Sequence, residues 1–325
     1  METDKAEQLI REAIARFNPG NTIASVEHLS TLPHSAVSRI VMSDGQRLIL
    51  KRAGSAEFAA GMRKEFIINR DVLSQLPNKV APRMLGGQED VEIPYLIFED
   101  SAVSHQPLSV ATPPGYSYLE RFVSTLAKAH AQSKHIDLEA AFSNVQGDVR
   151  VTDGSEYVPA VLDAFLHSKD RDQLPASAFT LIEKVRDNIP QIADLLSGQA
   201  CLIHGDAHAG NALYADDAVL LDWALTVIGP GEVDLCHLLA LNLPRYFASE
   251  YEPALIRRYV EVCANHDVTL SEEGVLARYR QCLLMTVIVA VGMQTVAGMP
   301  KTVGSYLFTN AVHSAMDHNI MEFLD

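Results

Sequence analysis

The chain has 325 residues, which is long enough for two packed lobes at roughly 150 residues per domain. It is 48% hydrophobic and 21% charged, a composition typical of soluble globular proteins. The formal net charge of −15 argues against a nucleic-acid partner, because nucleic-acid phosphates select basic surfaces.

The cysteines and the apolar segments predict a cytoplasmic protein. No Cys-x-x-Cys pair occurs, and we expect all four cysteines to be reduced core residues: Cys201, Cys236, Cys263 and Cys282. The N-terminus has no cationic start followed by an apolar run, so a secretory signal is not expected. Residues 283–299 are almost wholly apolar, but Gln294 interrupts them and Pro300 follows. A membrane span needs about 20 apolar residues, so we predict a buried helix and no membrane association.

The first hundred residues predict one helix and then short antiparallel strands. Residues 4–17 place apolar side chains at helical spacing and end at an Asn-Pro-Gly sequence. Strands over 37–42 and 47–50 flank an Asp-Gly turn, which is a strong hairpin signal. Two further strands are expected over 82–87 and 94–98.

The second part of the chain is mainly helical in its pattern. Apolar residues recur at helical spacing over 118–135, where we interpret His130 as a packed helix histidine. Residues 136–158 are polar and turn-rich, so they are either a substrate-site loop or a linker. We predict helices over 158–170 and 176–197.

The C-terminal residues also predict helices. A helix over 235–242 follows the sequence Gly-Pro-Gly-Glu-Val-Asp, whose last residue, Asp234, suits an N-cap. Residues 251–325 predict further helices, and no internal repeat or low-complexity tract occurs in the sequence.

The most informative stretch is 202–223, where a polar loop lies between two short apolar runs. It begins Leu-Ile-His-Gly-Asp-Ala-His-Ala-Gly-Asn and ends Val-Leu-Leu-Asp-Trp. Asp206 is followed by Asn211 five residues on and by Asp222 sixteen residues on. Hard divalent cations such as Mg²⁺ prefer such oxygen ligands, usually together with phosphate oxygens. In phosphoryl transfer the first Asp orients the attacking hydroxyl, while the Asn and the second Asp hold the metal ions.

His-Gly-Asp-x-x-x-x-Asn followed by Leu-Asp-Trp resembles the catalytic core of the aminoglycoside phosphotransferase and choline kinase superfamily. The spelling is most similar to its ecdysteroid-kinase-like branch. The resemblance implies an α+β, bilobal, protein-kinase-like fold. Residues 1–99 would form a small antiparallel-sheet N-lobe that binds the nucleotide, and 100–325 a larger, mostly helical C-lobe with the catalytic loop, metal site and acceptor site. It also implies transfer of a phosphate from ATP, with Mg²⁺, to a hydroxyl of a small molecule.

The resemblance implies a role for each polar residue of the motif. Asp206 would orient the acceptor hydroxyl and take its proton, and Asn211 and Asp222 would hold the metal. His204 would shape the loop through hydrogen bonds. For His208 two interpretations stay open: a hydrogen bond to the γ-phosphate, or a ring that packs the loop and fixes Asn211.

The resemblance also predicts an ion pair in the N-lobe. Lys51 ends the second strand of the hairpin and would contact the α- and β-phosphates. The helix predicted over 56–76 carries Glu65, whose carboxylate would hold that lysine.

Two further N-lobe segments are expected to contact the nucleotide. Residues 32–36 lie where a kinase fold places its phosphate loop but contain no glycine, so they are either an ordinary strand connection or a loop in which Ser35 meets a phosphate. The strand over 94–98 would lead into the hinge, where the C=O of Phe98 and the N–H of Asp100 would pair with adenine. The side chains of Glu99 and Asp100 are expected to be solvated.

Three alternatives compete with a small-molecule kinase. His-x-Asp-x-His is also typical of transition-metal sites, which suggests a metal-dependent hydrolase but leaves Lys51 and Glu65 unexplained. A non-catalytic, nucleotide-binding kinase relative is a second, although every catalytic position is filled. Protein kinases need a long activation segment, and only eleven residues separate Asp222 from Asp234. The sequence does not name the acceptor, which we expect to be a hydroxylated small molecule, nor the oligomeric state.

Overall fold

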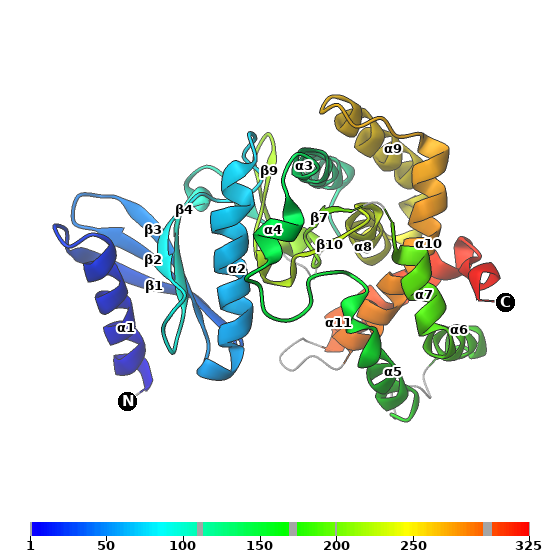
Figure 1. The fold of residues 1–325 in the computed structure, drawn as a ribbon, viewed down its shortest axis with the longest axis horizontal. Coiled ribbons are helices and arrows are strands. Elements are labelled where there is room, and N and C mark those ends of the chain that lie inside the picture. The colour runs from blue at the N-terminus through cyan, green and yellow to red at the C-terminus, as the bar shows by residue number, and fades with distance from the viewer. Residues whose placement is uncertain (1, 109–112, 169–173, 199, 295–300, 325) are drawn as a thin grey trace.

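A computed structural model describes residues 2–108, 113–168, 174–198, 200–294 and 301–324. An antiparallel sheet with two helices forms one lobe, and helices dominate the other (Figure 1). The predicted α+β, bilobal fold is therefore confirmed.

The N-lobe sheet is built from five antiparallel strands in the order β1-β2-β3-β5-β4. Their bounds are Ile23–Thr31 for β1, Ser35–Met42 for β2, Arg47–Ala53 for β3, Met84–Gln88 for β4 and Tyr95–Glu99 for β5. The predicted β2–β3 hairpin turns at Gly45, whose φ of 87° lies in the left-handed region that glycine enters without steric cost. All four predicted strands are therefore present.

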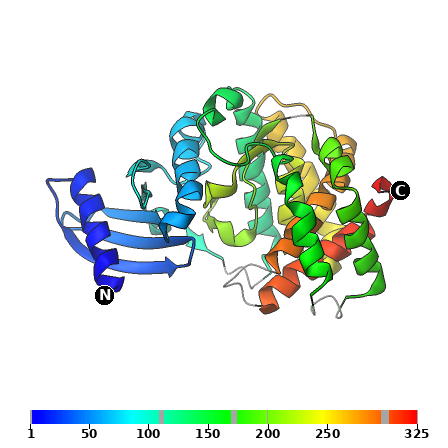
Figure 2. The ribbon, with the colours of Figure 1, turned by 60° about the horizontal axis from the view of Figure 1, so that its bottom comes forward.

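Helices cover the two faces of this sheet. α1 (Glu2–Phe17) lies across one face, where Ile10 and Ile14 join a buried cluster with Ile40 and Leu48 (Figure 2). α2 (Ala59–Asp71) stands between the sheet and the C-lobe (Figure 1). The helix predicted over 56–76 is thus shorter in the structure, because single turns of 3₁₀ helix replace both of its ends.

The C-lobe contains nine α-helices among the described residues. Their bounds are Tyr116–Ser133 for α3, Leu138–Phe142 for α4, Val158–Leu166 for α5, Ala176–Asp187 for α6, Ile189–Leu196 for α7, Glu232–Asn242 for α8, Arg245–Ala264 for α9, Glu272–Met293 for α10 and Lys301–Asp317 for α11. Five short strands form two small sheets: Gln106–Pro107 for β6, Cys201–Ile203 for β7, Ala212–Tyr214 for β8, Ala218–Leu220 for β9 and Val227–Gly229 for β10. β10 pairs with β7, and β6, β8 and β9 form the other sheet.

The prediction of one continuous helix over 176–197 is wrong. The pattern over 176–197 predicts a single helix, but the structure divides it into α6 and α7 at Asn188. Pro190 causes the break, because proline has no N–H to donate and its ring clashes with the preceding turn of a helix. α7 therefore starts anew with this proline in its first turn.

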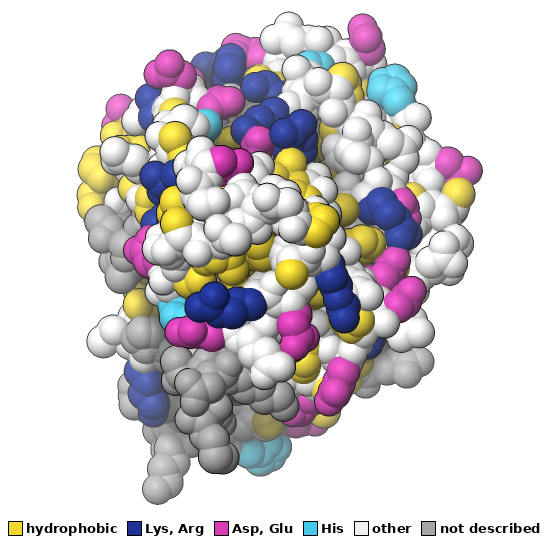
Figure 3. Space-filling model, turned by 90° about the vertical axis from the view of Figure 1, so that its left-hand side faces the viewer, with side chains coloured by type: hydrophobic (Ala, Val, Ile, Leu, Met, Phe, Trp, Pro, Cys, Tyr) yellow, Lys and Arg dark blue, Asp and Glu magenta, His cyan; other side chains and the backbone are white. Residues whose placement is uncertain are grey.

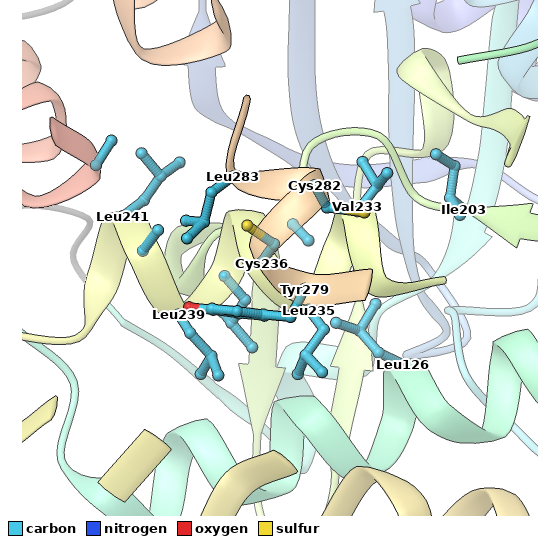
Figure 4. Packing of buried hydrophobic residues seen from close by; sticks show 14 of the residues in the cluster. Leu126, Ile203, Val233, Leu235, Cys236, Leu239, Leu241, Tyr279, Cys282 and Leu283 are labelled. Atoms are coloured by element: carbon cyan, nitrogen blue, oxygen red, sulfur yellow. The ribbon is translucent and has the colours of Figure 1, made fainter. Parts of the chain in front are cut away.

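The C-lobe core forms where α8 meets α10. Cys236 and Leu239 of α8 lie near Tyr279 and Leu283 of α10 (Figure 4), and all four are at most 1% exposed. The four cysteines are free and buried, as the sequence analysis expects.

α10 also accounts for most of the apolar segment 283–299. By length and composition alone this helix could cross a membrane, but 56% of its most apolar window is buried inside the protein. Residues 283–293 form its second half, which matches the predicted buried helix, while 295–300 lie outside the described residues.

The end face of the N-lobe carries charges of both signs. Lys and Arg side chains alternate there with Asp and Glu side chains around apolar patches (Figure 3). Neither positive nor negative charge therefore dominates this face.

Candidate active site

The polar residues of the central motif are placed by two short buried strands. β7 ends at Ile203 and passes into the loop that begins at His204, and the β8–β9 hairpin returns the chain to Asp222. The Leu221 N–H donates to the main-chain oxygen of Asn211 at 2.8 Å, which fixes the two arms of the motif side by side. Both arms therefore meet at one place in the C-lobe.

Asn211 holds Asp206 in position. Its Nδ2 donates to Oδ2 of Asp206 at 2.8 Å and to the main-chain oxygen of the same residue at 3.0 Å. Within the described residues, the side-chain hydrogen bonds to Asp206 reach Oδ2 alone. Oδ1 is therefore left to accept a hydrogen bond, and then a proton, from a bound hydroxyl.

The geometry of His208 bears on its two open interpretations. Its Nδ1 accepts from the Gly210 N–H at 3.1 Å, so Nε2 carries the ring proton in the neutral imidazole. Nε2 lies 3.6 Å from Oδ2 of Asp206. The ring thus helps to shape the loop, and contact with a γ-phosphate stays a prediction.

Gly205 lets the catalytic loop pass close to the segment after Asp222. Its φ of 81° lies in the left-handed region, and a Cβ at this position would lie 2.2 Å from the Leu225 main-chain oxygen. Any other residue here would force the loop and the segment after Asp222 apart.

Lys51 joins the two lobes through a pair of carboxylates. Its Nζ lies 2.6 Å from Oε2 of Glu65 on α2 and 2.8 Å from Oδ1 of Asp222. Burial alone would lower the pKa of Lys51, but the two carboxylates outweigh it and raise the pKa. The ammonium is therefore charged when the cleft is empty. The predicted Lys51–Glu65 pair is present, and Asp222 is a third member.

Asp222 is held in an uncommon backbone conformation. Its φ of 62° and ψ of 71° are left-handed, which few residues other than glycine adopt without strain. Burial would raise the pKa of this carboxyl, and Lys51 outweighs that effect and lowers it. Strain of this kind persists where the surrounding structure enforces a functional geometry.

Buried side chains of the C-lobe hold the catalytic loop, which begins at His204, in position. Asp234 accepts from the His204 N–H at 2.5 Å and from the Gly205 N–H at 3.0 Å. His130 donates to Asp234 at 3.0 Å and accepts from the Tyr259 hydroxyl at 2.9 Å. Burial would raise the pKa of Asp234, but the hydrogen bond from His130 prevails and lowers it.

Asp234 is not an N-cap, so that prediction is wrong. It is the third residue of α8, whose N-cap is Gly231. Its carboxylate serves the catalytic loop instead of its own helix. His204 does shape the loop as expected, since its Nε2 donates to the Leu221 oxygen at 2.7 Å and its Nδ1 accepts from the Asp206 N–H at 3.3 Å.

α8 supplies a second anchor and a buried histidine. Oδ1 of Asn242 accepts from the Ala209 N–H at 3.1 Å. His237 lies on the helix between Asp234 and Asn242, and its Nε2 is buried without a hydrogen-bond partner in the described part of the chain. Burial lowers the pKa of His237 to about 4.

We expect His237 to make the protein sensitive to acid. Its folded-state pKa of about 4 lies below the value of 6.5 for an ordinary histidine, so the unfolded chain takes up the proton first as the pH falls. The stability gained from the neutral ring is present above pH 6.5 and is lost as the pH falls toward 4. From neutral pH to about pH 5, His237 should cost about 2 kcal/mol of unfolding free energy.

Urea unfolding of the native protein and of His237→Gln at both pH values measures this loss. The variant should lose about 2 kcal/mol less than the native protein, because glutamine does not titrate. Equal losses in the two proteins would show that His237 does not carry the effect.

The N-lobe strands and the hinge line a cleft of about 430 Å³. Val37, Ile49, Lys51 and Phe98 face it from β2, β3 and β5, because alternate residues of paired strands share one face of a sheet. Leu213 and Leu221 line it from the C-lobe. The cleft is therefore apolar on both sides, a form suited to a planar base. Two charged groups also line it: Lys51, Glu65 and Asp222, and, at the hinge, Arg39, Glu99 and Asp100.

The side chain of Asp100 is buried, so the prediction of a solvated hinge charge is wrong. Its Oδ2 accepts from Nε of Arg39 at 2.9 Å and from Nε of Arg47 at 3.0 Å. Its Oδ1 accepts from the Ala102 N–H at 3.1 Å. The carboxylate thus clamps the hinge to the sheet, while base contacts from the main chain at Phe98 and Asp100 stay a prediction.

Ser35 and Arg39 are both on β2, but only Arg39 is among the residues that line the cleft. Ser35 is 7% exposed at the start of β2, paired with Ala53 and outside the set of residues that line the cleft. Its contact with a phosphate stays a prediction. Arg39 lines the cleft and was not foreseen. Strand alternation was the signal, since Arg39 follows Val37 by two residues and shares its face.

The transition-metal interpretation of His-x-Asp-x-His does not fit the geometry. Both ring nitrogens of His204 are occupied by main-chain partners, and Nδ1 of His208 accepts from Gly210. Among the described residues, no cluster of three or more His, Cys, Asp or Glu side chains is arranged to hold a metal ion. The pair Asn211 and Asp222 fits Mg²⁺ better, because both offer oxygen ligands beside space for phosphates.

The fold and the site define a small-molecule phosphotransferase with a protein-kinase-like architecture. The family model "Phosphotransferase enzyme family" matches residues 34–268, and the chain belongs to that family. It does not test the ecdysteroid-kinase-like branch, which stays a prediction. A comparison with curated protein sequences finds no significant match.

Solved structures of low sequence identity share the fold. The GDP complex of aminoglycoside 2'-phosphotransferase-IIIa has a TM-score of 0.64 at 15% identity over 96% of this chain and 99% of its own. Choline kinase LicA from Streptococcus pneumoniae has a TM-score of 0.62 at 14% identity over 96% and 98%. The streptomycin–ATP–APH(2")-IIa complex has a TM-score of 0.59 at 15% identity over 99% and 98%.

Proposed function

We propose that the protein transfers the γ-phosphate of Mg-ATP to a hydroxyl of a small molecule. One observation carries the proposal: Asn211 binds Oδ2 of Asp206 and leaves Oδ1 without a side-chain partner among the described residues, and Asn211 itself lines the cleft together with Lys51, Glu65 and Asp222. Asn211 thus connects a proton acceptor to a cleft that also contains a cation and a carboxylate able to bind a metal ion. This is the arrangement that phosphoryl transfer requires.

Each residue has a defined task in the proposed reaction. The adenine lies in the apolar cleft, and Lys51 binds the phosphates. Asn211 and Asp222 would hold Mg²⁺, which supplies positive charge to the phosphates when it is bound. Asp206 orients the acceptor hydroxyl and takes its proton late, because a loose transition state needs little base strength.

The acceptor is proposed to be a hydroxylated small molecule in the cytoplasm. Related folds include enzymes named for aminoglycosides and choline, which are small molecules. Eleven residues between Asp222 and Asp234 leave little room for the segment on which protein kinases dock a peptide. The free, buried state of the cysteines supports a reducing compartment.

We expect Mg-ATP to bind without an acceptor and to depend on Asp222. Calorimetry should show nucleotide affinity in the native protein and a loss of about tenfold or more in Asp222→Ala, since a metal ligand and the partner of Lys51 disappear together. The same titration with GTP reports the base preference. Tight zinc binding at His204 and His208 without nucleotide affinity would contradict the proposal.

The acceptor can be found by a screen for ATP consumption. The native protein is incubated with ATP, Mg²⁺ and a library of aminoglycosides, amino alcohols, sugars, steroids and other hydroxylated metabolites. A true acceptor raises ADP release in the native protein and leaves Asp206→Ala at its background rate. If the variant responds equally, the consumption comes from another reaction.

A further inference from the structure

Two adjacent side chains of α2 have partners in different lobes. Glu65 reaches β3 and pairs with Lys51 at 2.6 Å. Lys64 lies about 100° further round the helix, since an α-helix has about 3.6 residues per turn. Its Nζ donates to the main-chain oxygen of Asp148 at 2.7 Å, and the residue is only 8% exposed. Lys64 is therefore a buried cation that ties α2 to the C-lobe.

The segment that receives Lys64 is itself firmly held. The Ile228 N–H of β10 donates to the Val149 oxygen at 2.7 Å, and the Val151 N–H donates to the Ile228 oxygen at 3.0 Å. Oδ2 of Asp153 accepts from the N–H groups of Val149 at 2.8 Å and Arg150 at 2.7 Å. Residues 148–153 thus extend the β7–β10 sheet, which anchors them to the C-lobe independently of α2.

A second contact joins α2 to the same part of the C-lobe. The 3₁₀ turn Trp223–Leu225 packs against α2, and the main-chain N–H of Trp223 faces the Glu65 carboxylate. This turn leads directly into β10. The partners of Lys64 and of Glu65 in the C-lobe thus both depend on the stretch 223–229, which begins next to Asp222. Further along the helix, α2 also packs against α4, and Ile68 and Val72 join the C-lobe core cluster.

We propose that residues 148–153 act as a latch that holds α2 where Glu65 meets Lys51. Lys64 is then a positioning residue: it acts on the nucleotide site through Glu65 and touches no substrate. The sequence left two interpretations of the polar segment 136–158 open, a substrate-site loop or a linker. We assign the latch to the second half of this segment. The effect on nucleotide binding rests on the proposed function, whereas the latch itself does not.

Loss of the latch should change the pairing of Lys51. Without Lys64, α2 keeps its contacts with the N-lobe, such as those of Arg63 with the Glu89 and Val91 oxygens. α2 is then free to turn about these contacts, and Glu65 turns away from Lys51. Lys51 would be left with Asp222 alone, and that carboxylate would be less available to a metal.

The test uses Trp223, the single tryptophan of the chain, as a reporter. Its indole is 2% exposed in the folded protein. In Lys64→Met without nucleotide, we expect its emission to shift to longer wavelength and acrylamide quenching to rise by about twofold or more, because α2 no longer covers the turn. Lys64→Arg should restore the native values, since it keeps a charged donor.

Arg63→Met is the matched control. It removes the neighbouring cation of the same helix, whose hydrogen bonds within the described residues reach main-chain oxygens of the N-lobe. This variant should leave Trp223 emission unchanged. If Lys64→Met and Arg63→Met give the same quenching, the latch is absent.

Nucleotide affinity separates action through Glu65 from a general loss of structure. Lys64→Met should weaken Mg-ATP binding by about tenfold in the native background, the size expected for one hydrogen bond from a charged donor. In a protein that already carries Glu65→Gln, Lys64→Met should weaken Mg-ATP binding by less than about twofold, because Lys64 acts on the nucleotide site through Glu65. Equal losses in both backgrounds would overturn the proposal. If native protein binds no nucleotide, the proposed function fails, and the quenching result still decides the latch.

Asp153→Asn is a second test of the latch at an exposed residue, and it can be used if Lys64→Met does not fold. It weakens the hydrogen bonds to Val149 and Arg150 and leaves Lys64 in place. A rise in Trp223 quenching supports the latch. Native quenching in Asp153→Asn, together with native quenching in Lys64→Met, refutes it.

Discussion

Asp206→Asn is expected to lower the turnover number by about 10²- to 10⁴-fold while nucleotide affinity stays within about twofold. Asparagine fills the same space. Its oxygen can still accept from Nδ2 of Asn211, as Oδ2 of Asp206 does at 2.8 Å. The amide nitrogen then faces the acceptor where Oδ1 lay. That group donates and cannot take a proton, so binding survives and transfer is lost.

The measurement compares steady-state turnover with calorimetric nucleotide binding for the native protein and the variant. Asp216→Asn is a suitable control, because Asp216 is an exposed carboxylate on the β8–β9 turn of the same motif. The control should keep native turnover. If Asp206→Asn also keeps native turnover, another group accepts the proton and the assignment of Asp206 is wrong.

Much of the fold could be predicted from local patterns. The Asp-Gly turn fixed the position of the β2–β3 hairpin, and alternating strands placed Lys51 on the cleft face. The motif spacing brought Asp206 and Asn211 together, because both lie in one short loop between β7 and β8. Signals of this kind work where the physical cause is local in the chain.

Sequence patterns do not reveal a charge whose partner lies far away in the chain. Asp100 pairs with Arg39 and Arg47 from other strands, and Asp234 serves a loop about thirty residues away instead of its own helix. Local rules for caps and hinges assign such residues to the nearest backbone or to solvent. Lys64 is a third case, since nothing in its helix indicates a partner at Asp148.

Lys51 and Glu65 should prove interdependent in both stability and binding. Their side chains are 10% and 2% exposed, and the removal of one partner from a buried pair costs about 3–5 kcal/mol because the other charge is left uncompensated. We therefore expect Lys51→Met to be strongly destabilising. The double variant Lys51→Met/Glu65→Gln should recover part of that loss.

The pH dependence of Lys51→Met has a definite sign. In the native protein burial raises the pKa of Glu65, Lys51 lowers it in part, and Asp222 raises it. Without Lys51 the two main influences that remain both raise the pKa, so the folded state holds its proton more tightly than the unfolded chain. Stability is then present at low pH and is lost as the pH rises through the folded pKa. Lys51→Met should lose more stability at about pH 8 than at about pH 5, and addition of Glu65→Gln should remove most of this difference.

The same single and double variants of Lys51 and Glu65 test nucleotide affinity. Lys51→Met and Glu65→Gln should each weaken Mg-ATP binding by about tenfold or more, since Glu65 holds the ammonium that meets the phosphates. The double variant should bind no worse than Lys51→Met, because Glu65 has no role once its lysine is absent. Urea unfolding and calorimetry on the four proteins measure both effects. Losses that simply add in the double variant would show that the two residues act separately, and the ion pair would then have no part in nucleotide binding.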